Sequence, residues 1–171
     1  MLSVVIMSVS IPLSLEPWQI VNDGVMGGVS SSRMAETEEG LLFMGDLSLD
    51  NNGGFASVRR LVEDRLSGTG SVLLEVRGDG RTYQFRLRQS GRFDGVAWRA
   101  EFETSEGWRR VELTYDAFEP VFRGRSVPQA GPVVPSTIEQ IGFLLADKQP
   151  GPFRLEIRKI EFLPGRENDQ E

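Results

Sequence analysis

Apolar and polar residues alternate in short stretches along much of the chain, which is the pattern of β-strands with one buried face. The clearest stretch is Thr82–Arg88, whose apolar members would share one face: Tyr83, Phe85 and Leu87. Residues 97–104 repeat the pattern. We find no sustained period of 3.6 residues, which an amphipathic helix would show. The hydrophobic pattern therefore predicts a chain of short strands.

Further strands are expected at 40–49, 55–61, 72–77, 108–113 and 153–162, the last with a slip in phase before Ile160. Turns rich in Gly separate them at 50–54, 67–70 and 78–80. Residues 115–122 are interpreted as a loop packed on the core, 128–135 as an irregular connection, and 138–145 as a helical turn leading into a strand. About nine short strands predict an all-β fold, an antiparallel β-sandwich of the jelly-roll type.

A chain of 171 residues is expected to form one domain. We predict an N-terminal strand or extension at 1–15, a single β-sandwich domain at 16–163 and a polar tail at 164–171. The first fifteen residues are mildly apolar, carry no basic residue and contain Pro12, and they are too short to span a bilayer. The sequence thus predicts no membrane span and no clear targeting segment, with a first strand favoured over a weak or truncated signal, and hence a cytoplasmic protein.

The composition excludes several kinds of chemistry. The chain has no Cys and no His, so thiol catalysis, His general bases and the usual zinc ligands are absent. Acid–base catalysis by carboxylates such as Glu101 or Glu103 remains a remote alternative, because these residues lack an apolar pocket that would raise one pKa. A net charge of -6 argues against nucleic-acid binding. We therefore expect a non-enzymatic protein without a cofactor.

One stretch, 18–32, combines more special residues than any other: WQIVNDGVMGGVSSS. The Asn22-Asp23-Gly24 turn is followed by two adjacent glycines, so the backbone is able to bend twice. Oxygen acceptors beside flexible glycines suit a calcium or polar-ligand loop, with Asn22 and Asp23 as weak candidates for metal ligands. They also suit a structural corner that pins two sheets together, which is the interpretation we favour.

Other polar residues in Gly-containing turns are candidates for the same edge of the sandwich: Asn51, Asn52, Asp79 and Asp147. Together with Asn22 and Asp23 they would form either a calcium site or a set of Asx-turns, and Asx-turns are commoner. Arg59 interrupts an apolar strand and is predicted to pair with Asp23, Asp79 or Asp147. Arg123 and Arg125 are a second candidate clamp, for acidic groups of a partner or for internal carboxylates. Trp18 is a candidate for an exposed aromatic binding residue.

Two expected strands also carry a polar outer face. If they pair, one side presents Gln84, Arg86 and Arg88 and the other Arg99, Glu101 and Glu103. Opposite charges across such a pair stabilise a sheet by about 0.2–1 kcal/mol each. A solvated ladder is the favoured interpretation, and the functional alternative is a polar concave face for a sugar or a protein partner.

Several separated motifs occur in one order along the chain: WQIVNDGVMGGVS (18–30), NNGGFASVR (51–59), RGDGRTYQFRLR (77–88), EGWRRVELTYDAFEPVFRGR (106–125) and IEQIGFLLADKQPGPFRLEIRKI (138–160). Together they resemble the complex I intermediate-associated protein family over nearly all of 18–162. The resemblance implies a galactose-binding-like jelly roll, a fold that carbohydrate-binding modules share. It also implies a role in assembling respiratory complex I (NADH:ubiquinone oxidoreductase) as a chaperone rather than an enzyme.

The expected function is therefore that of a non-catalytic binding or assembly module that recognises a protein partner. The alternative is a carbohydrate-binding module of the galactose-binding-like superfamily. A protein partner and a carbohydrate differ in what they require of the surface, because sugars stack on exposed aromatic rings.

Overall fold

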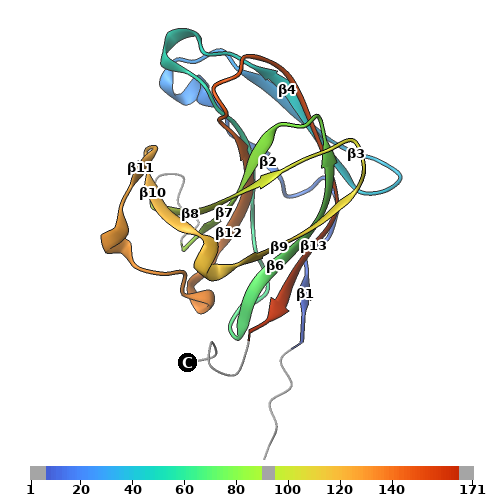
Figure 1. Cartoon of the computed structure of the whole chain (residues 1–171), viewed down its shortest axis with the longest axis vertical. Helices are drawn as coiled ribbons and strands as arrows, with labels where there is room; N and C mark the ends of the chain where they lie inside the picture. Colours follow the sequence, from blue (N-terminus) through green and yellow to red (C-terminus); the bar gives the residue numbers. More distant parts are fainter. Residues whose placement is uncertain (1–6, 90–94, 166–171) are drawn as a thin grey trace, which may run out of the picture.

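The computed structural model describes residues 7–89 and 95–165, and this part of the chain is built from antiparallel strands in two sheets (Figure 1). The first sheet has the order β3 (Ser31–Glu36), β4 (Leu41–Leu47), β13 (Gly151–Pro164), β6 (Thr69–Gly78) and β9 (Arg109–Thr114), and β1 (Val9–Ser10) pairs with β13. The second has the order β11 (Arg125–Ser126), β10 (Glu119–Phe122), β8 (Ala97–Glu103), β7 (Thr82–Arg88), β12 (Gln140–Leu145), β5 (Ala56–Leu61) and β2 (Gln19–Ile20).

The connections contain short 3-10 helices, η1 (Asp23–Met26), η2 (Asp50–Asn52), η3 (Tyr115–Ala117), η4 (Pro128–Ala130) and η5 (Pro135–Thr137). In the described residues we find no helix long and apolar enough to cross a membrane. The predicted all-β, antiparallel sandwich is confirmed.

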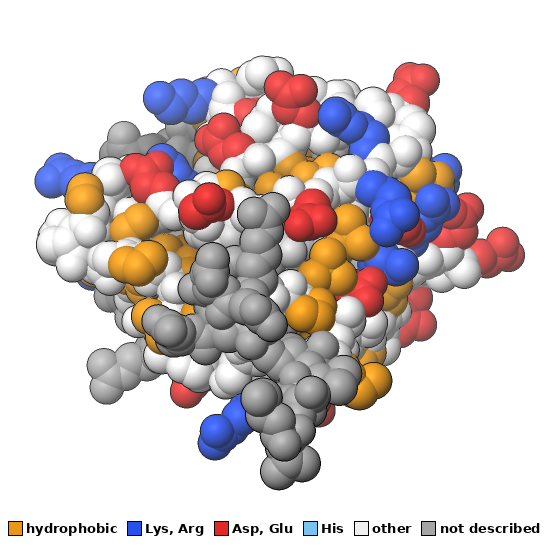
Figure 2. All heavy atoms as spheres, turned by 60° about the horizontal axis from the view of Figure 1, so that its bottom comes forward, with side chains coloured by type: hydrophobic (Ala, Val, Ile, Leu, Met, Phe, Trp, Pro, Cys, Tyr) orange, Lys and Arg blue, Asp and Glu red, His pale blue; other side chains and the backbone are white. Residues whose placement is uncertain are grey.

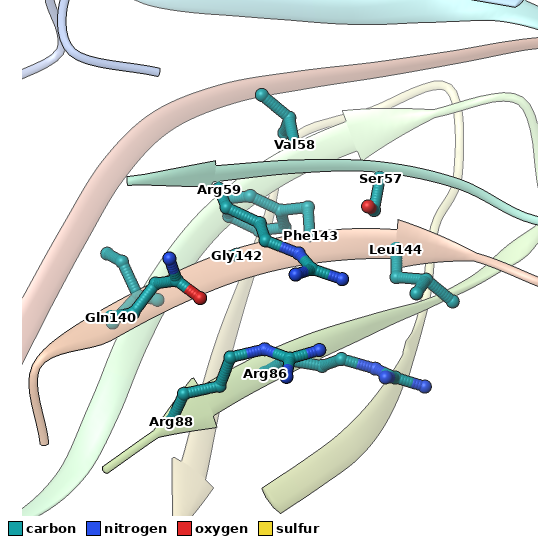
Figure 3. A pocket seen from close by; sticks show the side chains of 10 residues that line it. Ser57, Val58, Arg59, Arg86, Arg88, Gln140, Gly142, Phe143 and Leu144 are labelled. Carbon is teal, nitrogen blue, oxygen red and sulfur yellow. The ribbon is translucent and has the colours of Figure 1, made fainter. Parts of the chain in front are cut away.

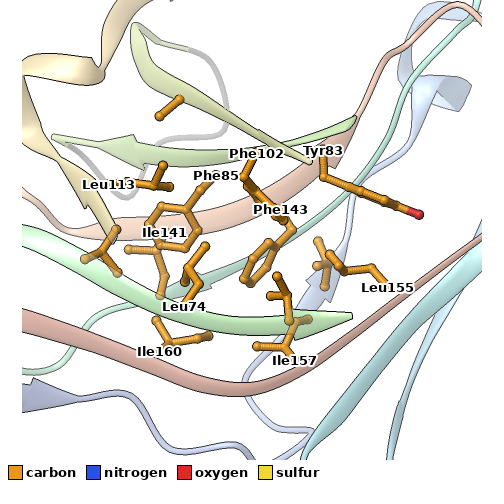
Figure 4. Close-up of a cluster of buried hydrophobic side chains, with 14 of the residues drawn as sticks. Leu74, Tyr83, Phe85, Phe102, Leu113, Ile141, Phe143, Leu155, Ile157 and Ile160 are labelled. Atoms are coloured by element: carbon orange, nitrogen blue, oxygen red, sulfur yellow. The ribbon is translucent and has the colours of Figure 1, made fainter. Parts of the chain in front are cut away.

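The core lies between the two sheets and combines aliphatic side chains with a group of aromatic rings (Figure 4). Tyr83, Phe85 and Leu87 are at most 1% exposed, so the alternation in β7 places the residues as its pattern predicts. Phe85 meets Phe143 of β12 edge to face, with ring centroids 5.2 Å apart. Burial of these aliphatic and aromatic side chains supplies most of the driving force that holds the sheets together.

Strand β13 confirms the predicted slip in phase. Ile157 pairs with Val76, whereas Lys159 pairs with Glu75, so the ladder with β6 is irregular at Arg158. One extra residue inverts the alternation, and Ile160 therefore points into the core on the same side as Ile157.

One expectation for the chain was wrong, and one strand was missed. The segment 115–122 is not a loop: η3 is followed by strand β10, which pairs with β8 and β11. Pro120 obscured this strand in the sequence, since proline lacks an N–H, but it lies opposite Trp98 near the sheet edge, where proline is tolerated. Strand β3, which carries few apolar residues, was not predicted, and it is an edge strand with one exposed flank.

The pairing of β7 with β8 differs from the expected ladder of opposite charges. Arg86 faces Arg99, Gln84 faces Glu101, and Glu103 faces Thr82. The alternation had correctly placed these side chains on the outer face, but the register depends on the connecting segment and could not be read from it. The register therefore places one like-charged pair, Arg86 and Arg99, side by side on the outer face.

Candidate binding surface

The opening loop folds around the carboxylate of Asp23, which is fully buried. It accepts hydrogen bonds from the backbone N–H and the hydroxyl of Ser30, at 3.0 and 2.6 Å. On the other side it accepts from the backbone N–H of Gly54 at 2.7 Å and, more weakly, of Phe55 at 3.4 Å. Burial alone would raise the pKa of Asp23, but these donors outweigh it and hold the pKa below its ordinary value of 3.8.

Two glycines let the backbone come this close to the carboxylate. A Cβ at Gly28 would lie 2.4 Å from the Asp23 Cγ atom, and one at Gly53 would lie 2.5 Å from its Oδ2 atom. The Gly-Gly pair and the Asn-Asn-Gly-Gly turn are therefore packed on one side chain, which explains why both motifs carry glycine.

Asn22 extends the same corner to both sheets. Its Oδ1 atom accepts hydrogen bonds from the Ser32 hydroxyl in β3 and from the Ser57 N–H in β5, at 2.9 and 3.2 Å. Asn51 is exposed in η2 with a positive φ of 57°, and the side chain of Asn52 lies outside the described part of the structure. The corner thus pins two sheets together, as the structural interpretation of this loop predicts.

The calcium interpretation does not fit these contacts. Backbone and hydroxyl donors point at the Asp23 carboxylate, and their positive ends occupy the directions from which a cation would approach. In the described ranges no group of three or more acidic residues is placed to hold a metal ion.

Asp79 and Asp147 belong to a separate network at the turn between β6 and β7. Asp79 accepts hydrogen bonds from the Tyr83 hydroxyl and from the Arg154 N–H, the latter at 2.7 Å. Asp147 forms an ion pair with Arg81, with Oδ1 and Nη1 3.5 Å apart. The turn carboxylates therefore brace their own turns and do not converge with Asp23.

The predicted pairing of Arg59 was wrong, because each of the three candidate carboxylates is engaged elsewhere. Arg59 lies on β5 and belongs to the outer face of the seven-stranded sheet. There it lines a hollow together with Arg86, Arg88 and Gln140 (Figure 3). The sequence of β5 does not predict this hollow, because the neighbours of Arg59 come from β7 and β12.

The sheet register gathers the arginines around this hollow. Arg59 pairs with Gly142, Gly142 with Arg86, and Arg86 with Arg99, so three of them share one row across the strands. Arg88 lies two residues along β7 on the same face. We call these four residues the arginine cluster: Arg59, Arg86, Arg88 and Arg99.

Gly142 makes room for the row. A Cβ at this position would lie 2.6 Å from the Val58 carbonyl oxygen and 3.3 Å from the Arg59 Cγ atom. The stem of Arg59 therefore crosses β12 where no side chain obstructs it, and its guanidinium extends toward Arg86 (Figure 3).

Burial and nearby positive charges disfavour the charged form of two arginines in the cluster. Burial, followed by the positive charges of Arg88, Arg59 and Arg99, lowers the pKa of Arg86 to about 9. Burial and the charge of Arg88 lower the pKa of Arg59 to about 10. The Arg86 guanidinium donates two hydrogen bonds to Gln84 Oε1, at 3.0 and 2.8 Å, so an uncharged amide orients it. An anion on this face would relieve the repulsion.

Other polar groups complete the hollow. Gln140 is 9% exposed, and its Oε1 atom is buried with no hydrogen-bond partner. At the far end of the row, Arg99 lies 3.4 Å from Glu119 in an exposed ion pair. Gln140 and Gly142 were missed as site residues, and the only signal for them was their alternation with the buried residues Ile141 and Phe143.

The tryptophans do not supply a sugar platform on this face. Trp18 is half-buried and packs on Phe143, with ring centroids 6.0 Å apart, and the Arg60 guanidinium lies 5.9 Å from its ring. Trp98 is 2% exposed. Trp108 lies on the other sheet beneath the guanidinium groups of Arg77 and Arg158.

The second candidate clamp lies at the edge of the same sheet. Arg125 is in β11 and Arg123 is in the turn before it, with a positive φ of 49°. The Arg123 guanidinium stacks 5.1 Å from the Phe122 ring. Because β11 and β5 are separated by four strands, this hairpin does not join Arg59 in one site.

The opposite sheet shows what a neutralised charged surface looks like in this protein. Glu156 binds Arg77 at 2.5 Å, and Glu75 binds Arg158 at 3.0 Å. Basic and acidic side chains are likewise interspersed on the surface seen in Figure 2. On the outer face of the seven-stranded sheet, the arginine cluster brings four guanidinium-bearing side chains close together in a chain whose net charge is -6.

Comparison with known proteins agrees with this architecture. The protein resembles the family 11 carbohydrate-binding module of Clostridium thermocellum, solved with a β-1,3-1,4-mixed-linked tetrasaccharide, with a TM-score of 0.69 and 15% identity over 92% of this chain and 96% of that one. A mutant of a family 29 carbohydrate-binding module gives a TM-score of 0.57 and 12% identity over 96% of both chains. These likenesses show that the chain shares the β-sandwich fold of these carbohydrate-binding modules.

The sequence defines the family more narrowly. Residues 8–157 match the family described as Complex I intermediate-associated protein 30 (CIA30). The mouse protein "Complex I intermediate-associated protein 30, mitochondrial" is 31% identical over 166 residues, which cover 84% of this chain and 51% of the relative. The chain belongs to the complex I intermediate-associated protein 30 family, and it spans about half the length of this curated relative.

Proposed function

We propose that the protein is a non-catalytic binding module that recognises a protein partner during assembly of respiratory complex I. The observation that carries this proposal is the family match over residues 8–157, together with the name of the 31% identical mouse relative. The arginine cluster is the surface that we assign to partner binding, since it concentrates charge on the outer face of a rigid sheet.

Two features support a binding role without catalysis. The chain contains neither Cys nor His, so nucleophile–base pairs that depend on them are absent. The most buried carboxylate, Asp23, is saturated by hydrogen bonds and joins the two sheets, which makes it structural. Arginine fits the proposed contact because its planar fork binds carboxylates in two-point fashion.

Deletion of the gene in its native host tests the proposal. We expect less assembled NADH:ubiquinone oxidoreductase on native gels and an accumulated subcomplex, both restored by the tagged wild-type protein. The tagged protein should comigrate with the subcomplex and not with the finished enzyme. An unchanged amount of assembled enzyme in the deletion strain would contradict the proposal.

Carbohydrate binding is the second candidate function, favoured by the fold shared with the family 11 module. Against it, the hollow is lined by arginine, glutamine and small or aliphatic side chains at its outward positions, with no aromatic ring among them. A glycan array that includes mixed-linked β-glucans distinguishes the two functions. Binding of a neutral glucan, weakened by Arg86→Met, would favour this candidate over the first.

A further inference from the structure

Strand β9 forms one edge of the six-stranded sheet. It is the last strand in the order β3-β4-β13-β6-β9, and it pairs with β6 from Arg109 to Thr114 (Figure 1). Among the described residues, its backbone forms no hydrogen bond with the backbone of any segment other than β6. The free flank of such a strand presents a row of N–H and C=O groups on which a further strand can pair.

The other sheet edges are shorter or partly covered. Strands β2 and β11, at the two ends of the seven-stranded sheet, have two residues each. Strand β3 has six residues, but its Glu36 carboxylate accepts a hydrogen bond from the Leu15 N–H at 2.7 Å, so the N-terminal segment lies against one end of it. Strand β9 also has six residues and is therefore the edge best suited to accept another strand.

The charges on β9 match those of a second copy of the same strand. Arg110 and Glu112 are exposed and lie two positions apart on the outer face, with Val111 between them. When two such strands pair antiparallel with Val111 opposite its own equivalent, Arg110 of each copy faces Glu112 of the other. The two opposite-charge pairs are related by a twofold axis, as in most homodimers.

Only one register gives this match. A shift of two residues is the smallest that keeps the outer faces of both copies on the same side. Such a shift places Arg110 opposite Arg110 in one direction and Glu112 opposite Glu112 in the other, and like charges directly opposite each other are destabilising. The sequence of β9 is therefore self-complementary about Val111.

The contact that Arg110 already makes is compatible with this pairing. Its Nε atom lies 3.7 Å from the Glu75 carboxylate, and its side chain is 68% exposed. Glu75 is also bound by Arg158 at 3.0 Å. Because a guanidinium has five N–H donors, Arg110 can contact Glu75 and Glu112 of the second copy at the same time. In the part of the chain that the structure describes, Glu112 forms no ion pair.

We propose that the protein self-associates through β9, which pairs antiparallel with β9 of a second copy about a twofold axis at Val111. The two six-stranded sheets then become one continuous sheet. This inference goes beyond the proposed function and does not depend on it, since the arginine cluster lies on the other sheet. An edge of six residues makes a small interface, so we expect half of the chains to be paired at roughly 10–100 µM.

Sedimentation velocity of the full chain, from about 1 to 300 µM, measures this self-association. Glu112→Arg and Arg110→Glu each create two like-charge pairs across the twofold axis and should weaken it by at least about tenfold. Glu38→Arg is the matched control, because it makes the same change of charge in the exposed turn between β3 and β4. It should change self-association less than about twofold.

Two further samples test the register itself. The double variant Arg110→Glu/Glu112→Arg restores opposite charges across the axis and should pair as the wild type does. In an equimolar mixture of the two single variants, one strand carries two arginines and the other two glutamates, so the mixture should form the dimer that neither variant forms alone. Thermal melting checks that each variant folds, and recovery of pairing in the mixture confirms it.

A wild-type chain that remains monomeric up to about 300 µM would overturn the inference. Self-association that Glu112→Arg leaves unchanged would overturn it as well, because the contact would then lie on another surface. So would a mixture of the single variants that stays monomeric. The gene deletion tests the assembly role separately, so that role stands or falls independently of these outcomes.

Discussion

Replacing Arg86 with methionine is expected to stabilise the ligand-free protein, although most substitutions destabilise. Arg86 is largely buried beside three other arginines, and burial and these charges lower its pKa to about 9. The drop from the ordinary arginine value corresponds to roughly 5 kcal/mol, because one pKa unit is about 1.4 kcal/mol. This value is the upper limit of the free energy by which the charged Arg86 side chain destabilises the folded state.

Lost hydrogen bonds offset part of the stabilisation that is expected from removing this charge. Methionine removes the two hydrogen bonds that Arg86 donates to Gln84, and a buried acceptor left without a partner costs about 1–3 kcal/mol. The similar length of methionine retains most of the packing of the stem. The net stabilisation is therefore about 2 kcal/mol, which raises the Tm by roughly 4–8 °C in a domain of this size.

Thermal unfolding followed by circular dichroism measures this effect, with Arg110→Met as the matched control. Arg110 is 68% exposed at its side chain and pairs loosely with Glu75, so its loss should change stability by less than about 0.5 kcal/mol. The folded pKa of Arg86 lies below the unfolded value, so the cost is present at every pH below about 9 and is relieved above it. The stabilisation by Arg86→Met should therefore shrink as the pH rises above about 9. A Tm equal to or below that of the wild type would refute the reasoning.

Three further predictions concern the corner and the glycine of the row. Asp23→Asn should destabilise the protein by about 2–4 kcal/mol in urea unfolding, since an amide cannot accept from all its donors, whereas exposed Asp50→Asn should be neutral. The pKa of Asp23 is lowered, so its contribution should be complete above pH 3.8 and lost as the pH falls through the folded value; a stability independent of pH there would contradict this. Gly142→Ala should cost about 1–3 kcal/mol by thermal melting, because its Cβ would meet the Val58 carbonyl, unlike Gly107→Ala, which meets open space.

The fold was predictable because alternation is a local signal. Tyr83, Phe85 and Leu87 could be assigned to the core from seven consecutive residues, and the phase slip in β13 was visible before Ile160. Strand β3 could not be found this way, since an edge strand needs few apolar residues to form.

The candidate surface was less predictable, because it depends on register and not on composition. Arg86 and Arg99 lie on the outer face as their alternation indicates, but only the pairing of β7 with β8 shows that they face each other. Arg59 joins them through Gly142, a residue with no side chain to mark it. The opening corner was easier to interpret, because the side chains of turn residues form hydrogen bonds with backbone groups close in the sequence.

Photo-crosslinking in the native host tests most directly whether this sheet is the docking surface. A photoreactive residue replaces Glu101, which is exposed on the outer face of β8, or Glu112, which is exposed on β9 of the opposite sheet. We predict that position 101 crosslinks to a complex I subunit or assembly factor and that position 112 does not. Crosslinks to such a protein from position 112 alone would contradict the assignment.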